Sequence, residues 1–239
     1  MSTTLANQMR PTKLNEIIGQ KHLVGPNAIL TKMVEKKHPF SIILYGEPGC
    51  GKTTIAMALA NDLNIPYRLF NASTGNKKEM DAIITEAQMT NGLFVIIDEV
   101  HRLNKARQDD LLSHVESGLI TIAGCTTSNP YHSINPAIRS RCHILEVKPL
   151  TSNEIISGLQ HAISFEKGLN NLFQIEDVVL NKIAKACGGD IRYAYNCLEI
   201  CTILADNNII TEKTFDQALI KTNVIYDQDE DNYYDTLSG

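Results

Sequence analysis

The chain has 239 residues, of which 43% are hydrophobic, and its formal net charge is −5. This hydrophobic content is enough for a packed core, but no apolar run reaches the roughly 18 residues needed to cross a membrane. The six cysteines include no Cys-x-x-Cys pair, which argues against a zinc knuckle and a disulfide framework. Because the N-terminus is polar and lacks a signal-peptide core, we expect a globular cytoplasmic protein with no membrane partner.

Apolar runs and helical spacings alternate along the first 150 residues, which is typical of a parallel sheet covered by helices. The predicted strands are 41–45, 67–71, 93–98, 120–126 and 143–147, and the predicted helices are 28–36, 53–63, 77–88 and 106–116. We therefore predict an α/β fold, in which helices flank a parallel sheet.

After Pro149 the strand signals end. Thr151 and Glu154 form the pattern of a helix N-cap, and apolar residues then recur at helical spacing. Further helices are predicted at 177–187, 191–205 and 211–221. This part is predicted to be a small all-helical domain.

A glycine-rich motif lies between the predicted strand 41–45 and the helix that follows it. It reads Gly-Glu-Pro-Gly-Cys-Gly-Lys-Thr, the pattern of a phosphate-binding loop. Backbone N–H groups and the helix dipole converge there on phosphates, Lys52 reaches the β- and γ-phosphates, and Thr53 coordinates Mg²⁺. The predicted nucleotide-binding residues of this loop are Gly46, Glu47, Pro48, Gly49, Cys50, Gly51, Lys52, Thr53 and Thr54.

Two acids, Asp98 and Glu99, end the apolar strand 93–98. At the carboxyl edge of a parallel sheet they would face the phosphate loop. There Asp98 can hold Mg²⁺ through water, and Glu99 can polarise the attacking water.

Asn129 follows the predicted strand 120–126. Its amide can donate to the γ-phosphate and accept from the attacking water, so we assign it a sensing role.

Three arginines complete the predicted site. Arg139 and Arg141 precede the last predicted strand, and we favour Arg141 as an arginine finger that enters a neighbouring subunit's site, with Arg139 as a helper. Arg192 falls in the first turn of a helix that follows two glycines. From there it can link the helical domain to bound nucleotide.

In this order the motifs resemble those of the AAA+ ATPases: Walker A, Walker B, sensor 1, arginine finger and sensor 2. Six further segments resemble the replication-associated recombination protein A family. They are Met9-Arg10-Pro11, Ile18-Gly19-Gln20, Asp98-Glu99-Val100-His101-Arg102, Gln108-Asp109-Asp110-Leu111-Leu112, Thr126-Thr127-Ser128-Asn129-Pro130 and Ser140-Arg141.

The resemblance implies a Mg²⁺-dependent, DNA-stimulated ATPase that acts at forks, gaps and duplex ends together with single-strand-binding protein. It places Arg10, Pro11, Ile18 and Gly19 in the adenine pocket. It also implies a nucleoid-associated protein, tetrameric at full length, whose relatives continue beyond Gly239 into an oligomerisation domain. We therefore expect a nucleotide-binding domain at 1–150, a helical lid at 151–223 and an acidic linker at 224–239, in a fragment that is monomeric by itself.

Two other functions stay open: a clamp-loader subunit, and a non-hydrolysing scaffold in which nucleotide gates binding of single-strand-binding protein. Asp98, Glu99 and Arg141 argue against the scaffold. Neither the near-neutral charge of residues 1–220 nor the acidic end decides whether DNA binds. The candidate DNA contacts are Lys77, Lys78, Lys105 and Arg107.

Overall fold

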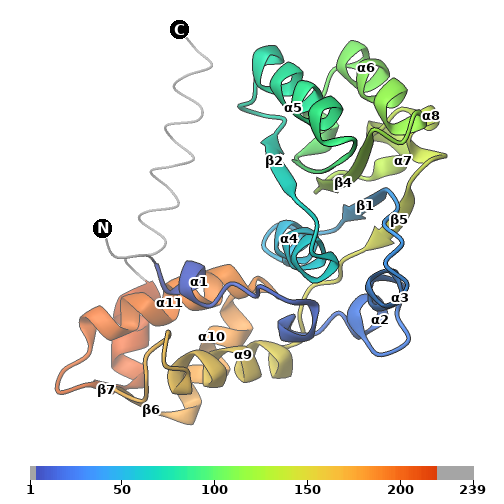
Figure 1. The fold of residues 1–239 in the computed structure, drawn as a ribbon. Coiled ribbons are helices and arrows are strands. Elements are labelled where there is room, and N and C mark those ends of the chain that lie inside the picture. Colours follow the sequence, from blue (N-terminus) through green and yellow to red (C-terminus); the bar gives the residue numbers. More distant parts are fainter. Residues whose placement is uncertain (1–3, 220–239) are drawn as a thin grey trace, which may run out of the picture. The chain divides into compact units, whose positions relative to one another are not determined.

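The chain forms two compact units in a computed structural model that describes residues 4–219 (Figure 1). Residues 11–149 form the α/β unit, and residues 4–10 together with 150–219 form the helical unit. We expected the first ten residues in the nucleotide-binding domain, so the N-terminal segment corrects that boundary. The expected acidic linker at 224–239 and the end of the expected lid lie outside the described residues.

The α/β unit is built on a parallel sheet with strand order β2-β3-β4-β1-β5 in the described part of the chain. The strands are β1 (Ile42–Tyr45), β2 (Tyr67–Asn71), β3 (Leu93–Asp98), β4 (Ile120–Thr126) and β5 (His143–Glu146). The first five residues of β3 are buried, as expected for a parallel strand covered on both faces. The predicted α/β fold and its strands are confirmed, with ends that shift by one residue in β1 and β5.

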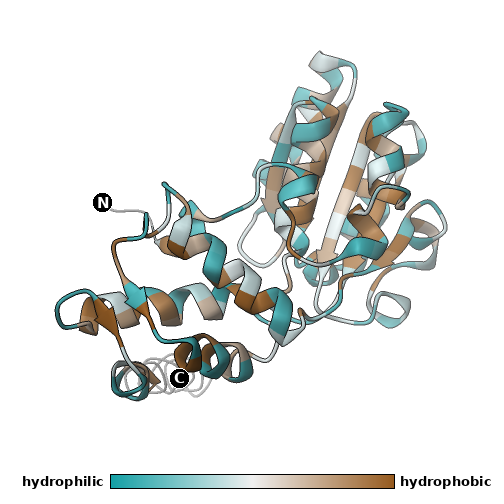
Figure 2. Ribbon diagram, turned by 90° about the horizontal axis from the view of Figure 1, so that it is seen from below, coloured by the Kyte–Doolittle hydropathy of each residue, from teal (hydrophilic) through white to brown (hydrophobic). Residues whose placement is uncertain are grey.

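Helices cover both faces of this sheet. Their bounds are η1 (Leu14–Glu16), α2 (Lys21–Val24), α3 (Ile29–Glu35), α4 (Lys52–Leu63), α5 (Lys77–Thr90), η2 (Val100–Arg102), α6 (Lys105–Glu116), α7 (Pro130–Ser133) and α8 (Pro136–Arg139). Leu44 and Ile96 pack with α3 and α4, whereas their neighbours Ile43 and Ile97 pack with α5, α6 and α8. This alternation of strand side chains makes two cores, and the hydrophobic colour gathers on the strands in Figure 2.

The helical unit contains α1 (Leu5–Gln8), α9 (Ser152–Ser164), α10 (Asp177–Ala186), α11 (Ile191–Leu204) and a further helical segment at 212–219. Thr151 and Glu154 form the predicted capping box at the start of α9. The N-terminal segment is anchored by buried Leu5, whose N–H donates to Glu199 Oε1 on α11 at 3.1 Å. Two short parallel strands, β6 (Gln174–Ile175) and β7 (Ile209–Ile210), correct the expectation that this part is entirely helical. Among the described residues, no helix combines the length and hydropathy that crossing a membrane requires.

Candidate nucleotide-binding site

The register of the sheet brings the site together. β1 pairs with β4 so that Tyr45 lies opposite Thr126, and the next residue, Gly46, donates its N–H to the Thr126 carbonyl at 3.3 Å. β3 lies on the other side of β4 and ends at Asp98. The phosphate loop and the two predicted acids therefore start from the same edge of the sheet.

Glycine is required at both ends of the loop. A Cβ on Gly46 would collide with the Val147 carbonyl oxygen. Gly51 has a φ of +97°, and a Cβ built there has no heavy atom within 4 Å, so this side of the loop is open. Gly51 is also the N-cap of α4 and provides no side-chain cap, so the first-turn N–H groups of α4 can bind an anion. This open, donor-rich loop fits a phosphate group.

Lys52 is folded over the loop. Its Nζ lies 2.9 Å from the Gly46 carbonyl oxygen and 2.8 Å from that of Glu47, and the residue is 8% exposed. The Cys50 thiol donates to the same Glu47 carbonyl at 2.8 Å. Burial raises the pKa of Cys50 although Lys52 is nearby, so the thiol is neutral and supports the loop through a hydrogen bond.

Thr53 and Asp98 meet beside the loop. The Thr53 hydroxyl on α4 donates to Asp98 Oδ1 on β3 over 3.2 Å. The Glu99 N–H also donates to this oxygen at 3.2 Å. A hydroxyl and a carboxylate are oxygen ligands of the kind that Mg²⁺ prefers, so this pair fits the ion.

Glu99 begins the turn from β3 into η2 with a left-handed backbone, φ 52°. Its Oε2 lies 3.3 Å from His101 Nδ1, but it has no hydrogen-bond partner within the described residues. The distance is that of an ion pair without the alignment of a hydrogen bond. His101 Nδ1 also lies 2.9 Å from the Thr126 hydroxyl. Sequence reasoning missed His101 and Thr126 as site residues, although both stand in segments that carried the resemblance.

Asn129 is exposed and forms the N-cap of α7. Its Oδ1 accepts from the Tyr131 N–H at 2.9 Å, so this oxygen serves the turn instead of a water. The predicted role as an acceptor from water is therefore in competition with the cap, whereas the amide nitrogen can still donate. Its action on the γ-phosphate stays a prediction.

The two neighbouring arginines have different surroundings. Arg141 forms an ion pair with Glu116 at the end of α6, and its Nη1 donates to the Ala137 carbonyl at 2.9 Å. Arg139 donates to the Tyr131 carbonyl at 2.9 Å and lies 5.3 Å from the centre of that ring. Arg139 is thus packed against α7, and the more exposed Arg141 remains the better candidate for contact with a neighbour.

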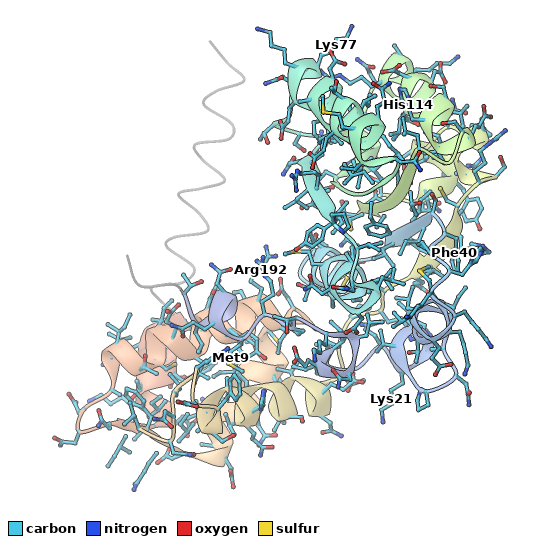
Figure 3. All side chains as sticks on the ribbon, viewed as in Figure 1. Met9, Lys21, Phe40, Lys77, His114 and Arg192 are labelled. Atoms are coloured by element: carbon cyan, nitrogen blue, oxygen red, sulfur yellow. The ribbon has the colours of Figure 1, made fainter. Side chains whose placement is uncertain are left out.

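The remaining predicted residues divide between the two units. Arg192 is exposed in the first turn of α11, as predicted, and Figure 3 labels it there. Arg10 belongs to the helical unit, whereas Pro11, Ile18 and Gly19 belong to the α/β unit. The structure does not bring Arg10 or Arg192 to the phosphate loop within one unit, so their roles stay predictions.

Gln20 anchors the Ile18–Gly19 turn. Its side chain donates to the Lys148 carbonyl at 2.6 Å and accepts from the Lys148 N–H at 3.1 Å. The turn is therefore fixed next to the segment that follows β5, and the same segment carries the Val147 carbonyl that limits Gly46.

Comparison with known proteins identifies the class. Residues 42–150 match the model of the ATPase family associated with various cellular activities (AAA), and residues 169–239 match the AAA C-terminal domain. The fold is similar to the RuvB Holliday junction branch migration motor of Thermotoga maritima, with a TM-score of 0.74 and 28% identity over 89% of this chain and 72% of that chain. The chain belongs to the AAA ATPase family.

Within this family the chain is similar to replication-associated recombination protein A. It is 46% identical to the Bacillus subtilis protein over 98% of this chain and 58% of that protein, and 32% identical to the Escherichia coli K12 protein over 98% and 55%. The ATPase WRNIP1 of Dictyostelium discoideum is 31% identical over 98% of this chain and 30% of its own length. The resemblance expected from the motifs is confirmed, and the chain spans little more than half of its bacterial relatives.

Proposed function

We propose that this chain carries the ATP-hydrolysing core of a DNA-dependent ATPase of the replication-associated recombination protein A type. Its work would be replication-fork maintenance, recombination and repair, through ATP-driven remodelling of DNA ends, gaps or forks. The observation that carries the proposal is the 3.2 Å contact between the Thr53 hydroxyl and Asp98, next to an open glycine-rich loop.

In this proposal the triphosphate lies on the loop from Gly46 to Thr54. The Lys52 ammonium exchanges its two loop carbonyls for β- and γ-phosphate oxygens, which bind it more strongly because they are charged. Mg²⁺, held by Thr53 and Asp98, would neutralise charge that develops on the phosphates. Pro11, Ile18, Gly19 and Arg10 would surround the adenine.

Hydrolysis needs a positioned water and charge stabilisation. Glu99 orients and polarises the water, and the amide nitrogen of Asn129 donates to the γ-phosphate. Arg141 would act on the site of a neighbouring subunit, and Arg192 would report the nucleotide state to the helical unit. The Glu116 ion pair supports the first of these two roles, since it leaves the Arg141 guanidinium at an accessible surface.

The N-termini of α5 and α6 support a DNA-binding role. The two helices lie side by side in Figure 1, and Arg107 on α6 donates to the Gly75 carbonyl just before α5 at 3.3 Å. Lys77, Lys78 and Lys105 are exposed at these helix starts. Cationic side chains attract backbone phosphates, so we propose this edge as the DNA contact.

Single-strand-binding protein, a tetrameric full-length assembly and a nucleoid-associated cytoplasmic location belong to the proposal through the family likeness. ATP turnover, measured with and without forked DNA, tests the function on this chain and on the full-length protein. Stimulation by forked DNA supports it, and a DNA-independent rate in both would contradict the DNA-dependent part.

Two substitutions test the site itself. Lys52→Ala should abolish nucleotide binding, because it removes the cation that meets the phosphates. Glu99→Gln should bind ATP normally and hydrolyse it at least about a hundredfold more slowly, since it removes the group that polarises water. Binding of a fluorescent ATP analogue and phosphate release measure the two effects. Tight binding of the ATP analogue by the Lys52→Ala variant would contradict the assignment of this loop as the nucleotide-binding site.

A further inference from the structure

His101 stands between two parts of the proposed site. Its side chain is only 13% exposed. The same ring nitrogen, Nδ1, lies 3.3 Å from Glu99 Oε2 and 2.9 Å from Thr126 Oγ1. One ring nitrogen of this mostly enclosed side chain therefore faces both a carboxylate and a hydroxyl.

Thr126 carries this contact to the turn after β4. The residue is fully buried, and its hydroxyl accepts from the Ser128 N–H at 3.0 Å and lies 3.3 Å from the Ser128 carbonyl oxygen. Asn129 is the next residue. A continuous series of contacts therefore runs from Glu99 through His101 and Thr126 to the turn that carries the predicted phosphate sensor.

His101 Nδ1 can satisfy only one of its two neighbours well. As an N–H group it donates either to the carboxylate or to the hydroxyl; as a lone pair it accepts from the hydroxyl and repels the carboxylate. A movement of the turn would change the position of the Thr126 hydroxyl. The interaction between Nδ1 and the Glu99 carboxylate would then become stronger or weaker.

The backbone around His101 is fixed, so its ring cannot move far from this choice. The Arg102 N–H donates to the Glu99 carbonyl at 2.8 Å and closes η2. Val100 is buried directly over Gly124 of β4, where a Cβ would lie 3.2 Å from Val100 Cγ1. This close packing holds η2 against β4. Only the side-chain contacts of His101 with Glu99 and Thr126 can then change.

We infer that His101 is a positioning residue that holds the Glu99 carboxylate through Nδ1 and, through Thr126 at the end of β4, couples its orientation to the turn at residues 127–128. The inference rests on the proposed function, because it assigns His101 a role through Glu99. When the turn withdraws the Thr126 hydroxyl, Nδ1 holds Glu99 alone. When the turn engages Nδ1, the carboxylate can turn toward the water while the ring still limits its orientation.

A steady-state comparison of variants tests this inference. His101→Ala should lower kcat by about tenfold or more while the KM for ATP and the affinity for a fluorescent ATP analogue stay within about twofold. His101→Asn, whose amide can occupy the place of Nδ1, should recover part of kcat. Thr126→Val removes only the hydroxyl and should also lower kcat. His38→Ala, at an exposed histidine of the same unit, is the matched control and should leave kcat unchanged.

The decisive measurement is a double-mutant cycle with Glu99→Gln. If His101 acts through Glu99, adding His101→Ala to Glu99→Gln should cause almost no further loss of kcat. Additive losses, or a wild-type kcat in both His101 variants, would overturn the inference. A wild-type kcat in Glu99→Gln alone would instead overturn the proposed function. If His101→Ala does not fold, His101→Asn and Thr126→Val carry the same cycle.

Discussion

Arg141 and Glu116 form an ion pair in which both side chains remain accessible, at 39% and 44% exposure. Water and salt screen such a pair, so it adds little to the stability of the fold. The Arg141 guanidinium can therefore leave Glu116 for a phosphate in a neighbouring site at small cost.

Glu116→Gln should accordingly reduce the free energy of unfolding by less than about 1 kcal/mol, as measured by urea denaturation. Glu35→Gln is a suitable comparison, because its pair with Lys32 is similarly exposed at 48% and 46%. A loss above about 2 kcal/mol at Glu116 alone would mean that the ion pair is part of the fold and that Arg141 is not free to act elsewhere.

At the scale of elements, α11 places Tyr195 in the core of the helical unit, where it is 4% exposed. Burial raises the pKa of Tyr195 to about 12 from its usual value of 10.0. The unfolded chain therefore loses this proton first as the pH rises. The stability that Tyr195 contributes is complete below pH 10 and is lost as the pH rises toward 12.

Between pH 9 and pH 11.5, the unfolding free energy of Tyr195→Phe should fall less than that of the wild type. The difference should be on the order of 2 kcal/mol, because phenylalanine has no proton to lose. Tyr131→Phe, at a tyrosine that is 60% exposed, should keep the wild-type dependence. Equal pH dependence in the wild type and Tyr195→Phe would show that Tyr195 ionises as easily in the folded state as in the unfolded one.

Elements with strong local signals were predictable. The apolar run of β3 and the glycine pattern before α4 each specify their structure within a few residues, and parallel pairing then brings Asp98 to Thr53. Two-residue strands such as β6 are too short for any periodicity to reveal.

Contacts between distant parts of the sequence were not predictable. Leu5 joins the helical unit through Glu199, which is 194 positions away. Neither local sequence indicates this contact. The His101–Thr126 contact likewise depends on how η2 packs on β4. The residues of the proposed site were named from the sequence, whereas the contacts that hold them in place needed the three-dimensional structure.

At the scale of the whole molecule, the proposal that Arg141 acts in a neighbour's site can be tested by mixing two inactive variants. The full-length Arg141→Ala variant keeps its phosphate loops but lacks the proposed arginine finger. The Lys52→Ala variant keeps the proposed arginine finger but cannot bind nucleotide at its loops. Mixing the two inactive proteins and allowing subunits to exchange should restore part of the ATPase rate, because mixed neighbours form complete sites. Phosphate release as a function of the mixing ratio measures this.

The recovery should be greatest near equal amounts and absent for either protein alone. Mixing Arg141→Ala with an Arg141→Ala, Lys52→Ala double variant is the control and should restore nothing. No recovery in the first mixture, despite subunit exchange, would mean that Arg141 serves its own site or none.

The N-terminal segment gives the two units an unusual covalent relationship. Because residues 4–10 belong to the helical unit, the backbone passes between units twice, at Arg10–Pro11 and again at Pro149–Leu150. Each crossing includes a proline, whose ring fixes one backbone torsion. Any displacement of the helical unit would therefore have to change backbone torsions at both crossings.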